Sequence, residues 1–279
     1  MHSRREFVGA AVALGALGLL AGGKVLAQSD AFDTLLRQAI NDPSLLDATR
    51  TSREGFGEQY ESRAIAPRTP LSSRAISEAA ITLITTFEVT DRARYEAKFQ
   101  QPIWPAGESG VTIGIGYDLG YVTADWLNED WEARLADGEL ATLRKVCGLR
   151  AEEARDALAQ VRDVAVPWDI ADQQFRTRLL PRYVALTLAR LPNTDKLSDD
   201  SLGALVSLVY NRGASFHKDG PRYREMRMIR QHMVNEAYDA IPAELRSMAR
   251  LWTGVPNMRG LVLRRELEAA LFERGLKSA

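Results

Sequence analysis

Cysteine and histidine are scarce in this sequence of 279 residues. There is one cysteine, Cys147, and there are three histidines, so an intrachain disulfide is excluded and no Cys or His cluster has the spacing of a metal site. Charge of one sign is lacking as well, because 36 basic residues nearly balance 37 acidic ones. Neither nucleic acid nor an anionic membrane surface is therefore an expected partner, and we expect no cofactor.

The first 27 residues are typical of a bacterial twin-arginine (Tat) export signal. Arg4 and Arg5 form the pair, a Gly/Ala-rich apolar stretch follows, and Val25-Leu26-Ala27 places small residues at both specificity positions of a signal-peptidase site. The alternative is a membrane anchor, which about 20 strongly apolar residues would suit better. We expect residues 1–27 to be removed and the protein to be periplasmic or secreted, with membrane contact only through the uncleaved signal. Removal takes away three basic residues and one acidic residue, which moves the formal net charge from −1 to −3.

The mature chain divides into two parts. Residues 28–71 read as an N-terminal extension: "AFDTLLRQAI" (31–40) suits a short amphipathic helix, and the polar, turn-rich stretch after it suits a linker. From 72 to 275 we expect one domain with a small β-hairpin set among many helices, which is an α+β, mostly helical pattern. The expected helices of this domain are 72–88, 123–135, 138–147, 151–163, 170–191 with a kink at Pro181, 198–211, 222–235, 242–252 and 259–274.

The stretch "GVTIGIGYDLG" (110–120) has the alternation of a β-strand, with Val111, Ile113 and Ile115 on one face. The other face carries one hydroxyl and two glycines. Glycine weakens a strand and packs nothing, so it often marks a place where a ligand or another backbone comes close. We therefore expect something to approach the glycine face of this strand.

Glu88 is the first candidate for a catalytic group. Ile81, Ile84 and Glu88 share one helix face, so the acid occupies a position where an apolar side chain is expected. It also lies near the C-terminal end of the predicted helix. Burial and the negative end of the helix dipole both favour the protonated carboxylic acid, the form that a general acid needs. The plainer alternative is a solvated glutamate at a fraying helix end.

Four motifs in order resemble the phage-type lysozymes of glycoside hydrolase family 24. They are "FE" closing an apolar helix at Glu88, the "TIGIG" of the 110–120 stretch, "LGALVSLVYNRGASF" (202–216) and "LWTGVPNMRGLVLRRELEAALF" (251–272). The resemblance covers about residues 73 to 275, with a loosely similar middle. It implies a lysozyme-like fold, with a hairpin beside the catalytic helix and a helical C-terminal lobe.

The resemblance also implies roles for single residues. Glu88 would protonate the leaving oxygen, and the hydroxyl of Thr112 would position the attacking water. Gly114 and Gly116 would face a sugar ring of the substrate. Further candidates near the substrate are Tyr117, to which we give no chemistry, Asp118, and Asn211, which is equally suited to a helix C-cap. Trp104 and Trp252 could stack on sugar faces but are more typical of a core. Either Arg264 or Arg265 could pair with Glu88 or another cleft acid, although pairing at the surface is the commoner arrangement.

The second acid departs from the family pattern. Six residues before the threonine the family usually has Asp or Cys, and here Ala106 stands. Glu108, in the turn "AGESG", is the best substitute, because glycosidases commonly use two carboxyl groups that flank the bond. A solvated turn acid is the alternative for Glu108. If Glu108 is not catalytic, either Asp118 takes the role or the site has decayed.

Two classes of function remain open from the sequence. The first is an exported muramidase, a monomer without cofactor that cleaves the β-1,4 bond between N-acetylmuramic acid and N-acetylglucosamine in peptidoglycan, using Glu88, Thr112 and Glu108. A related possibility is a hydrolase of another aminosugar glycan. The second is a non-catalytic wall-binding protein on a lysozyme-like domain, because a fold does not determine its function.

The export signal leads to a testable prediction. The precursor is expected to be cleaved after Ala27, and the double change Arg4→Lys and Arg5→Lys is expected to hold it in the cytoplasm, because the paired guanidinium groups are what the export route reads. Cell fractionation and N-terminal sequencing of the exported protein check this. Exported material that begins at His2 or Ser3 would contradict cleavage.

Overall fold

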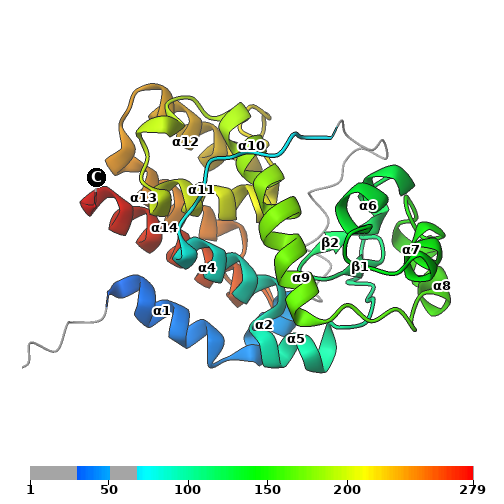
Figure 1. Cartoon of the computed structure of the whole chain (residues 1–279). Helices are drawn as coiled ribbons and strands as arrows, with labels where there is room; N and C mark the ends of the chain where they lie inside the picture. The colour runs from blue at the N-terminus through cyan, green and yellow to red at the C-terminus, as the bar shows by residue number, and fades with distance from the viewer. Residues whose placement is uncertain (1–29, 51–67, 279) are drawn as a thin grey trace, which may run out of the picture.

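The computed structural model describes residues 30–50 and 68–278, and within them the chain is mostly helical with one small antiparallel sheet (Figure 1). The α+β, mostly helical expectation is confirmed at that level. The predicted signal at 1–27 and most of the predicted polar linker lie outside the described residues. No helix within the described ranges combines the length and the apolarity needed to cross a bilayer.

The described helices fall before and after the hairpin in the chain. The N-terminal part holds α1 (Ala31–Ile40), α2 (Pro43–Arg50), α4 (Glu78–Val89) and α5 (Arg92–Lys98). After the hairpin come α6 (Ala124–Trp131), α7 (Asp137–Arg144), α8 (Ala151–Ala157), α9 (Trp168–Gln174), a π-helical turn (Phe175–Leu179), α10 (Leu180–Arg190), α11 (Asp199–Arg212), α12 (Arg224–Val234), α13 (Ile241–Ser247) and α14 (Arg259–Lys277). Each predicted helix has its counterpart here, with shifted ends.

Two of these shifts have a clear cause. The helix expected over 72–88 begins only at Glu78, because the side chain of Ser77 accepts the N–H of Ala80 and caps it there. The helix expected over 170–191 widens into the π-helical turn just before Pro181. Pro181 lacks an N–H, so a local change of helix type beside it is expected.

Helix α11 is the centre of the larger lobe. Its residues from Ser201 to Tyr210 are all buried, as expected for a helix that is covered on every side. Helices α14, α4 and α10 pack against it. A Cβ on Gly203 would lie 2.2 Å from the Cβ of Ala80, so this glycine lets α11 and α4 approach closely.

The N-terminal helices belong to this packed body. The expectation of a helix at 31–40 is confirmed by α1. The linker expected at 49–70 was placed too early, because Thr49 and Arg50 are the last residues of α2, and both helices pack against α14. Leu46 is buried, and the Thr49 hydroxyl donates to the carbonyl of Asn257 at 3.1 Å. Only from residue 51 onward does the expected linker lie outside the described residues.

The smaller lobe holds the hairpin and helices α6, α7 and α8, and α9 and α10 run between the two lobes (Figure 1). Strand β1 (Thr112–Ile113) pairs with β2 (Tyr117–Asp118), so the stretch expected to be one strand is a tight hairpin. Gly114 and Gly116, with φ of 58° and 76°, form its turn. The glycines are there because the turn needs left-handed backbone, which other residues adopt only at a cost.

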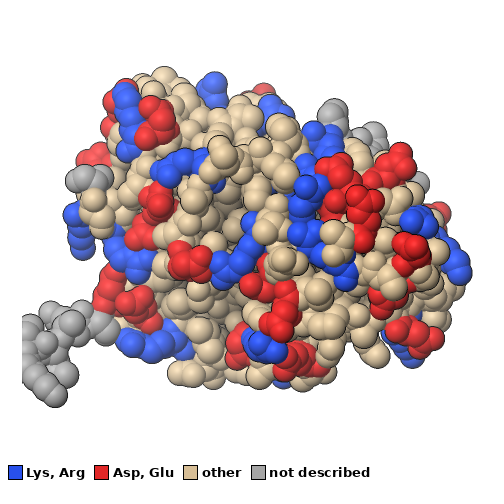
Figure 2. All heavy atoms as spheres, viewed as in Figure 1, with Lys and Arg blue, Asp and Glu red and all other residues tan. Residues whose placement is uncertain are grey.

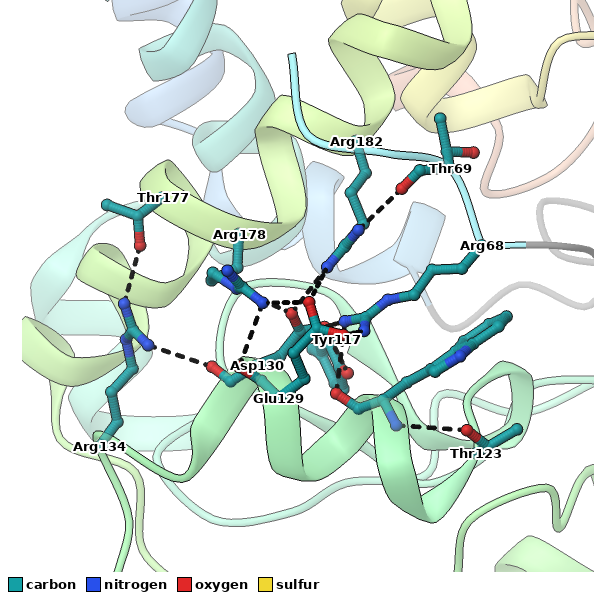
Figure 3. Close-up of polar contacts among 11 residues, drawn as sticks. Arg68, Thr69, Tyr117, Thr123, Glu129, Asp130, Arg134, Thr177, Arg178 and Arg182 are labelled. Atoms are coloured by element: carbon teal, nitrogen blue, oxygen red, sulfur yellow. Dashed lines mark hydrogen bonds and ion pairs between the residues drawn. The ribbon is translucent and has the colours of Figure 1, made fainter. Parts of the chain in front are cut away.

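An ionic cluster joins the two lobes (Figure 3). The Asp130 carboxylate on α6, only 3% exposed, lies against Arg178 at 3.0 Å and Arg182 at 3.1 Å from the α9–α10 helix and against Arg68 at 2.6 Å. The hydroxyl of Tyr117 also donates to it at 2.9 Å. Burial acts against ionisation, but the bond and charge of Arg182 lower the pKa of Asp130 overall. Figure 2 shows basic and acidic side chains side by side where the lobes meet.

The cluster gives a stability prediction. Asp130→Asn leaves three arginines facing an uncharged amide, and breaking a buried ion pair on one side is strongly destabilising. Because these arginines are partly solvated, we expect a loss of about 2–3 kcal/mol in the free energy of unfolding, measured by urea denaturation. Glu129→Gln is the matched control: Glu129 joins the same arginines but is 55% exposed, so its loss should stay below about 1 kcal/mol. Equal losses in the two variants would contradict a buried ionic joint.

Candidate active site

A cavity of about 470 Å³ opens beside the C-terminal end of α4. Its walls come from helices α2, α4 and α5, from the chain at 99–105 and from the hairpin. Its larger apolar lining residues are Phe99, Ile103, Trp104 and Pro105. The remaining lining residues are Asp47, Ala48, Arg50, Glu88, Val89, Lys98, Thr112, Gly114 and Gly116.

Five of the residues predicted near the reaction or the substrate line this cavity: Glu88, Trp104, Thr112, Gly114 and Gly116. Glu88, on the last turn of α4, has a side chain that is 24% exposed. Thr112 and the hairpin glycines reach the same cavity. A Cβ on Gly116 would lie 2.5 Å from the Tyr210 hydroxyl and 3.4 Å from Oε2 of Glu88. The groups that come close to the hairpin are thus a tyrosine and the predicted acid.

Helix α14 supplies the partner of Glu88. Nη1 of Arg264 lies 3.3 Å from Oε1 of Glu88, which confirms the expectation that one of the two arginines pairs with a cleft acid. The Arg264 side chain is 2% exposed and also donates to Ser207 and to Glu268. Glu268 in turn accepts from Arg265 at 2.9 Å. A buried polar network of Arg264, Arg265, Ser207 and Glu268 therefore holds one oxygen of Glu88, and Oε2 lies toward the hairpin.

Arg50 and Asp47 line the cavity from α2, and neither was among the site residues predicted from the sequence. The Arg50 guanidinium reaches the end of α4 and donates to the carbonyls of Thr86 at 2.7 Å and Phe87 at 2.9 Å. A start signal for α2 is present in the sequence: Asp42 accepts from the N–H of Leu45 at 3.0 Å, directly before a proline at the first helical position. Nothing in the sequence near α2 indicates that Arg50 will contact the end of α4.

The hairpin turn is attached to the larger lobe. The hydroxyl of Tyr210 on α11 donates to the carbonyl of Ile115 at 3.0 Å. The backbone of Thr112 pairs with that of Ile103, with N–H to carbonyl distances of 2.8 and 3.0 Å. Tyr183 packs on Tyr210 with ring centroids 4.3 Å apart. Thr112 is thus held on a rigid segment, which a residue that positions water requires.

Glu108, the first choice for the second acid, does not line this cavity. It is exposed and borders a separate hollow with Arg150, Glu152 and Glu153. The cause is the backbone of its turn. Tyr121 donates to the Glu108 carbonyl at 2.8 Å, and the N–H of Ala151 donates to the carbonyl of Ser109 at 3.0 Å. Both bonds draw the turn toward the smaller lobe.

Asp118, the second choice for the other acid, closes the hairpin instead of facing the cavity. Its Oδ1 accepts from the N–H of Gly110 at 2.9 Å and of Gly120 at 2.8 Å. Burial raises the pKa of Asp118 from its ordinary 3.8 to about 7, against the opposing effect of these bonds and of Arg150. A Cβ on Gly110 would lie 2.2 Å from the backbone nitrogen of Gly120, so the loop is too tight there for a side chain.

The remaining predicted substrate contacts have other partners. Tyr117 is buried, donates to Asp130 and packs edge-on against Trp131 at 5.4 Å. Asn211 accepts from Arg265 at 2.9 Å rather than capping α11, where Gly213 takes the C-cap position. Trp252 is buried under the guanidinium groups of Arg212 and Arg265. None of the three is among the residues that line the cavity.

Metal chemistry has no ready site in the described ranges, where no group of three or more His, Cys, Asp or Glu residues is placed to hold an ion. No protein-family model matches the chain, and no curated protein sequence matches it.

Asp118 provides a prediction with a definite sign. Its raised pKa stabilises the fold fully below about pH 4, and this contribution is lost as the pH rises through about 7. Asp118→Asn keeps Oδ1 as the acceptor of both N–H groups and removes the buried charge. We expect the variant to equal or exceed the wild type in stability at pH 8 and to lack the fall between pH 4 and 7, as followed by denaturant unfolding at each pH. A large loss of stability at pH 8 would contradict this account.

Proposed function

We propose that this protein is an exported muramidase with a lysozyme-like fold, which hydrolyses the β-1,4 bond between N-acetylmuramic acid and N-acetylglucosamine in peptidoglycan. One observation carries the proposal: Glu88 and Thr112 reach one cavity, while Arg264 orients the Glu88 carboxyl group. This is the arrangement that the four sequence motifs led us to expect. Export through the twin-arginine route would bring the enzyme to its polymeric substrate.

The division of work follows from the two oxygens of Glu88. Oε1 is bonded to Arg264, so Oε2, which lies on the side of Gly116, carries the proton given to the leaving oxygen. The Thr112 hydroxyl orients a water molecule for attack on the anomeric carbon. Gly116 keeps the space above Oε2 open, because a side chain there would fill it. Positioned acid catalysis of this kind typically gives ~10²–10⁴-fold in rate.

The apolar wall of the cavity suits a sugar ring. Trp104 is half-buried and its indole N–H donates to the carbonyl of Ser109 at 3.1 Å, so the ring is held in place. Phe99 and Pro105 extend the same wall. Rigid aromatic and ring-shaped side chains of this kind offer the flat, water-excluding contact that the faces of pyranose rings use.

A second function, glycan binding without cleavage, is favoured by one observation. Glu108 lies outside the cavity and Ala106 replaces the usual acid, so the hairpin loop brings no second carboxylate to Glu88. Asp47 is the other carboxylate of the cavity wall, but Arg50, Arg94 and Lys98 already contact it. An enzyme built this way would depend on Glu88 and the Thr112-bound water alone.

The proposal is tested on the reaction itself. Glu88→Gln keeps an oxygen for Arg264 but cannot donate a proton, so we expect peptidoglycan cleavage to fall by at least about a hundredfold with little change in Tm. Thr112→Val removes only the hydroxyl and should lose most activity. The measurements are the clearing of a peptidoglycan suspension and identification of the released fragments by their reducing-end sugar.

Two further variants make this test specific. Glu96→Gln is the matched control, because Glu96 is an exposed glutamate on α5 that does not line the cavity. It should keep wild-type activity. Glu108→Gln is expected to do the same, and a large loss there would return Glu108 to the mechanism. A wild-type protein that binds peptidoglycan and releases no fragment would overturn the enzyme in favour of the binding protein.

A further inference from the structure

We propose that Arg50 is a positioning residue for Glu88, so that the N-terminal helix α2 is a working part of the site. The part of this inference that concerns the rate of catalysis rests on the proposed function above. Arg50 is the last residue of α2, and its side chain is 14% exposed. It reaches across to α4, 36 and 37 positions further along the chain, beside the predicted acid.

The first reason is what Arg50 bonds to. The final carbonyls of a helix lack partners within the helix and need them from elsewhere. Nε of Arg50 donates to the carbonyl of Phe87 at 2.9 Å. Nη2 donates at 2.7 Å to the carbonyl of Thr86, which also accepts the N–H of Thr90 at 2.9 Å. Thr86 and Phe87 are the two residues directly before Glu88. The planar, forked guanidinium thus holds the last turn of α4 from outside.

The second reason is the strained corner after Glu88. Thr90 ends α4 with φ of 73° and ψ of −72°, and a β-branched residue adopts positive φ only under constraint. Nη2 of Arg50 donates to the Thr90 hydroxyl at 2.9 Å. Thr90 is also buried. Arg50 therefore bonds on both sides of Glu88 along the chain and helps to hold the corner that aims it.

The third reason is that Arg50 is itself held. Its Nη1 bonds to Asp47 at 2.9 Å, and Lys98 contacts the other oxygen of that aspartate at 2.9 Å. Helix α2 sits tightly on α14, because a Cβ on Gly260 would lie 2.2 Å from the Thr49 hydroxyl oxygen. Both ends of the connection from α14 to α4 are thus rigid.

Charge gives the inference a measurable signature. The described groups that face Glu88 are Arg50 from α2, Arg264 from α14, Tyr183 from α10 and Tyr210 from α11. Burial lowers the pKa of Arg50 to about 10, against the opposing charge of Glu88, so Arg50 stays positive at neutral pH. Removing its charge favours the protonated form of Glu88.

Three variants separate charge from geometry. Arg50→Gln loses both the charge and the fork. Arg50→Lys keeps the charge, but an ammonium group cannot reproduce the planar double donation to Thr86 and Phe87. Arg37→Gln is the control, since it removes the same charge from an exposed position on α1. Each full-length mature variant is compared by Tm, by kcat and KM on peptidoglycan, and by 13C NMR titration of the Glu88 carboxyl carbon, assigned with Glu88→Gln.

In Arg50→Gln we expect kcat to fall by about tenfold to a hundredfold with KM nearly unchanged, because the acid is misplaced and not the sugar contacts. Its Glu88 titration should move to higher pH than in the wild type, because a nearby positive charge that favours the carboxylate is gone. Arg50→Lys should lose kcat but keep the wild-type titration, and Arg37→Gln should match the wild type in both.

Wild-type kcat and wild-type Glu88 titration in Arg50→Gln would overturn the inference, as would a loss confined to Tm. If Arg50→Gln fails to fold, Arg50→Lys decides by the same kinetic readout. If the wild type cleaves no peptidoglycan, the proposed function fails, and the NMR titration of Arg50→Gln still decides whether Arg50 acts on Glu88.

Discussion

The guanidinium of Arg264 lies where α4, α11 and α14 meet and bonds to residues of all three helices. A buried charge is tolerated only when it is paired and its donors are satisfied. Arg264 and Arg265 on one side, Glu88 and Glu268 on the other, balance in formal charge. The position of Glu88 is therefore bound to the packing of the larger lobe, and α14 cannot move without moving the acid's partner.

The smaller lobe is held to this frame at two places. The Asp130 cluster is ionic and lies at the lobe boundary, while the Tyr210 hydroxyl reaches the hairpin turn directly. Between them they place Thr112 and the two turn glycines on the far wall of the cavity from α2. The cavity is lined by two stretches of sequence, 47–50 and 88–116, and the contacts that hold these stretches together lie partly outside it.

Helix α2 makes the N-terminal part of the mature chain a packed part of the domain and of the cavity wall. A segment that precedes a catalytic domain is often a spacer, and its polar composition suggested this here. In the structure, Leu46 and Thr49 are buried against the domain, and Arg50 and Asp47 line the cavity. Cutting the chain at residue 72 to isolate a domain would remove one wall of the cavity.

Several features could be predicted from the sequence, because they depend on local pattern. Glu88 was found because an acid interrupts an apolar helical stripe, and the hairpin because β-branched residues and glycines alternate. The two arginines after the apolar run at 260–263 were candidates to pair with a cleft acid, and only the structure identifies Arg264 as the partner of Glu88. By contrast, the alternation at 110–120 was first interpreted as one strand, since a period of two does not distinguish a strand from a hairpin whose turn is flanked by glycines.

By itself, then, the sequence determined the approximate helix positions and the hairpin, and it proposed Glu88 as the candidate acid, because all of these depend on residues close together in the chain. Only the tertiary structure decided which other residues join Glu88. Arg50 lines the cavity because helix α2 packs against α14. Glu108 lies outside it because Tyr121 and the N–H of Ala151 bond to the carbonyls of the Glu108–Ser109 turn. Such contacts join residues far apart in the chain, and a side chain's partner across that distance is set by how whole helices pack.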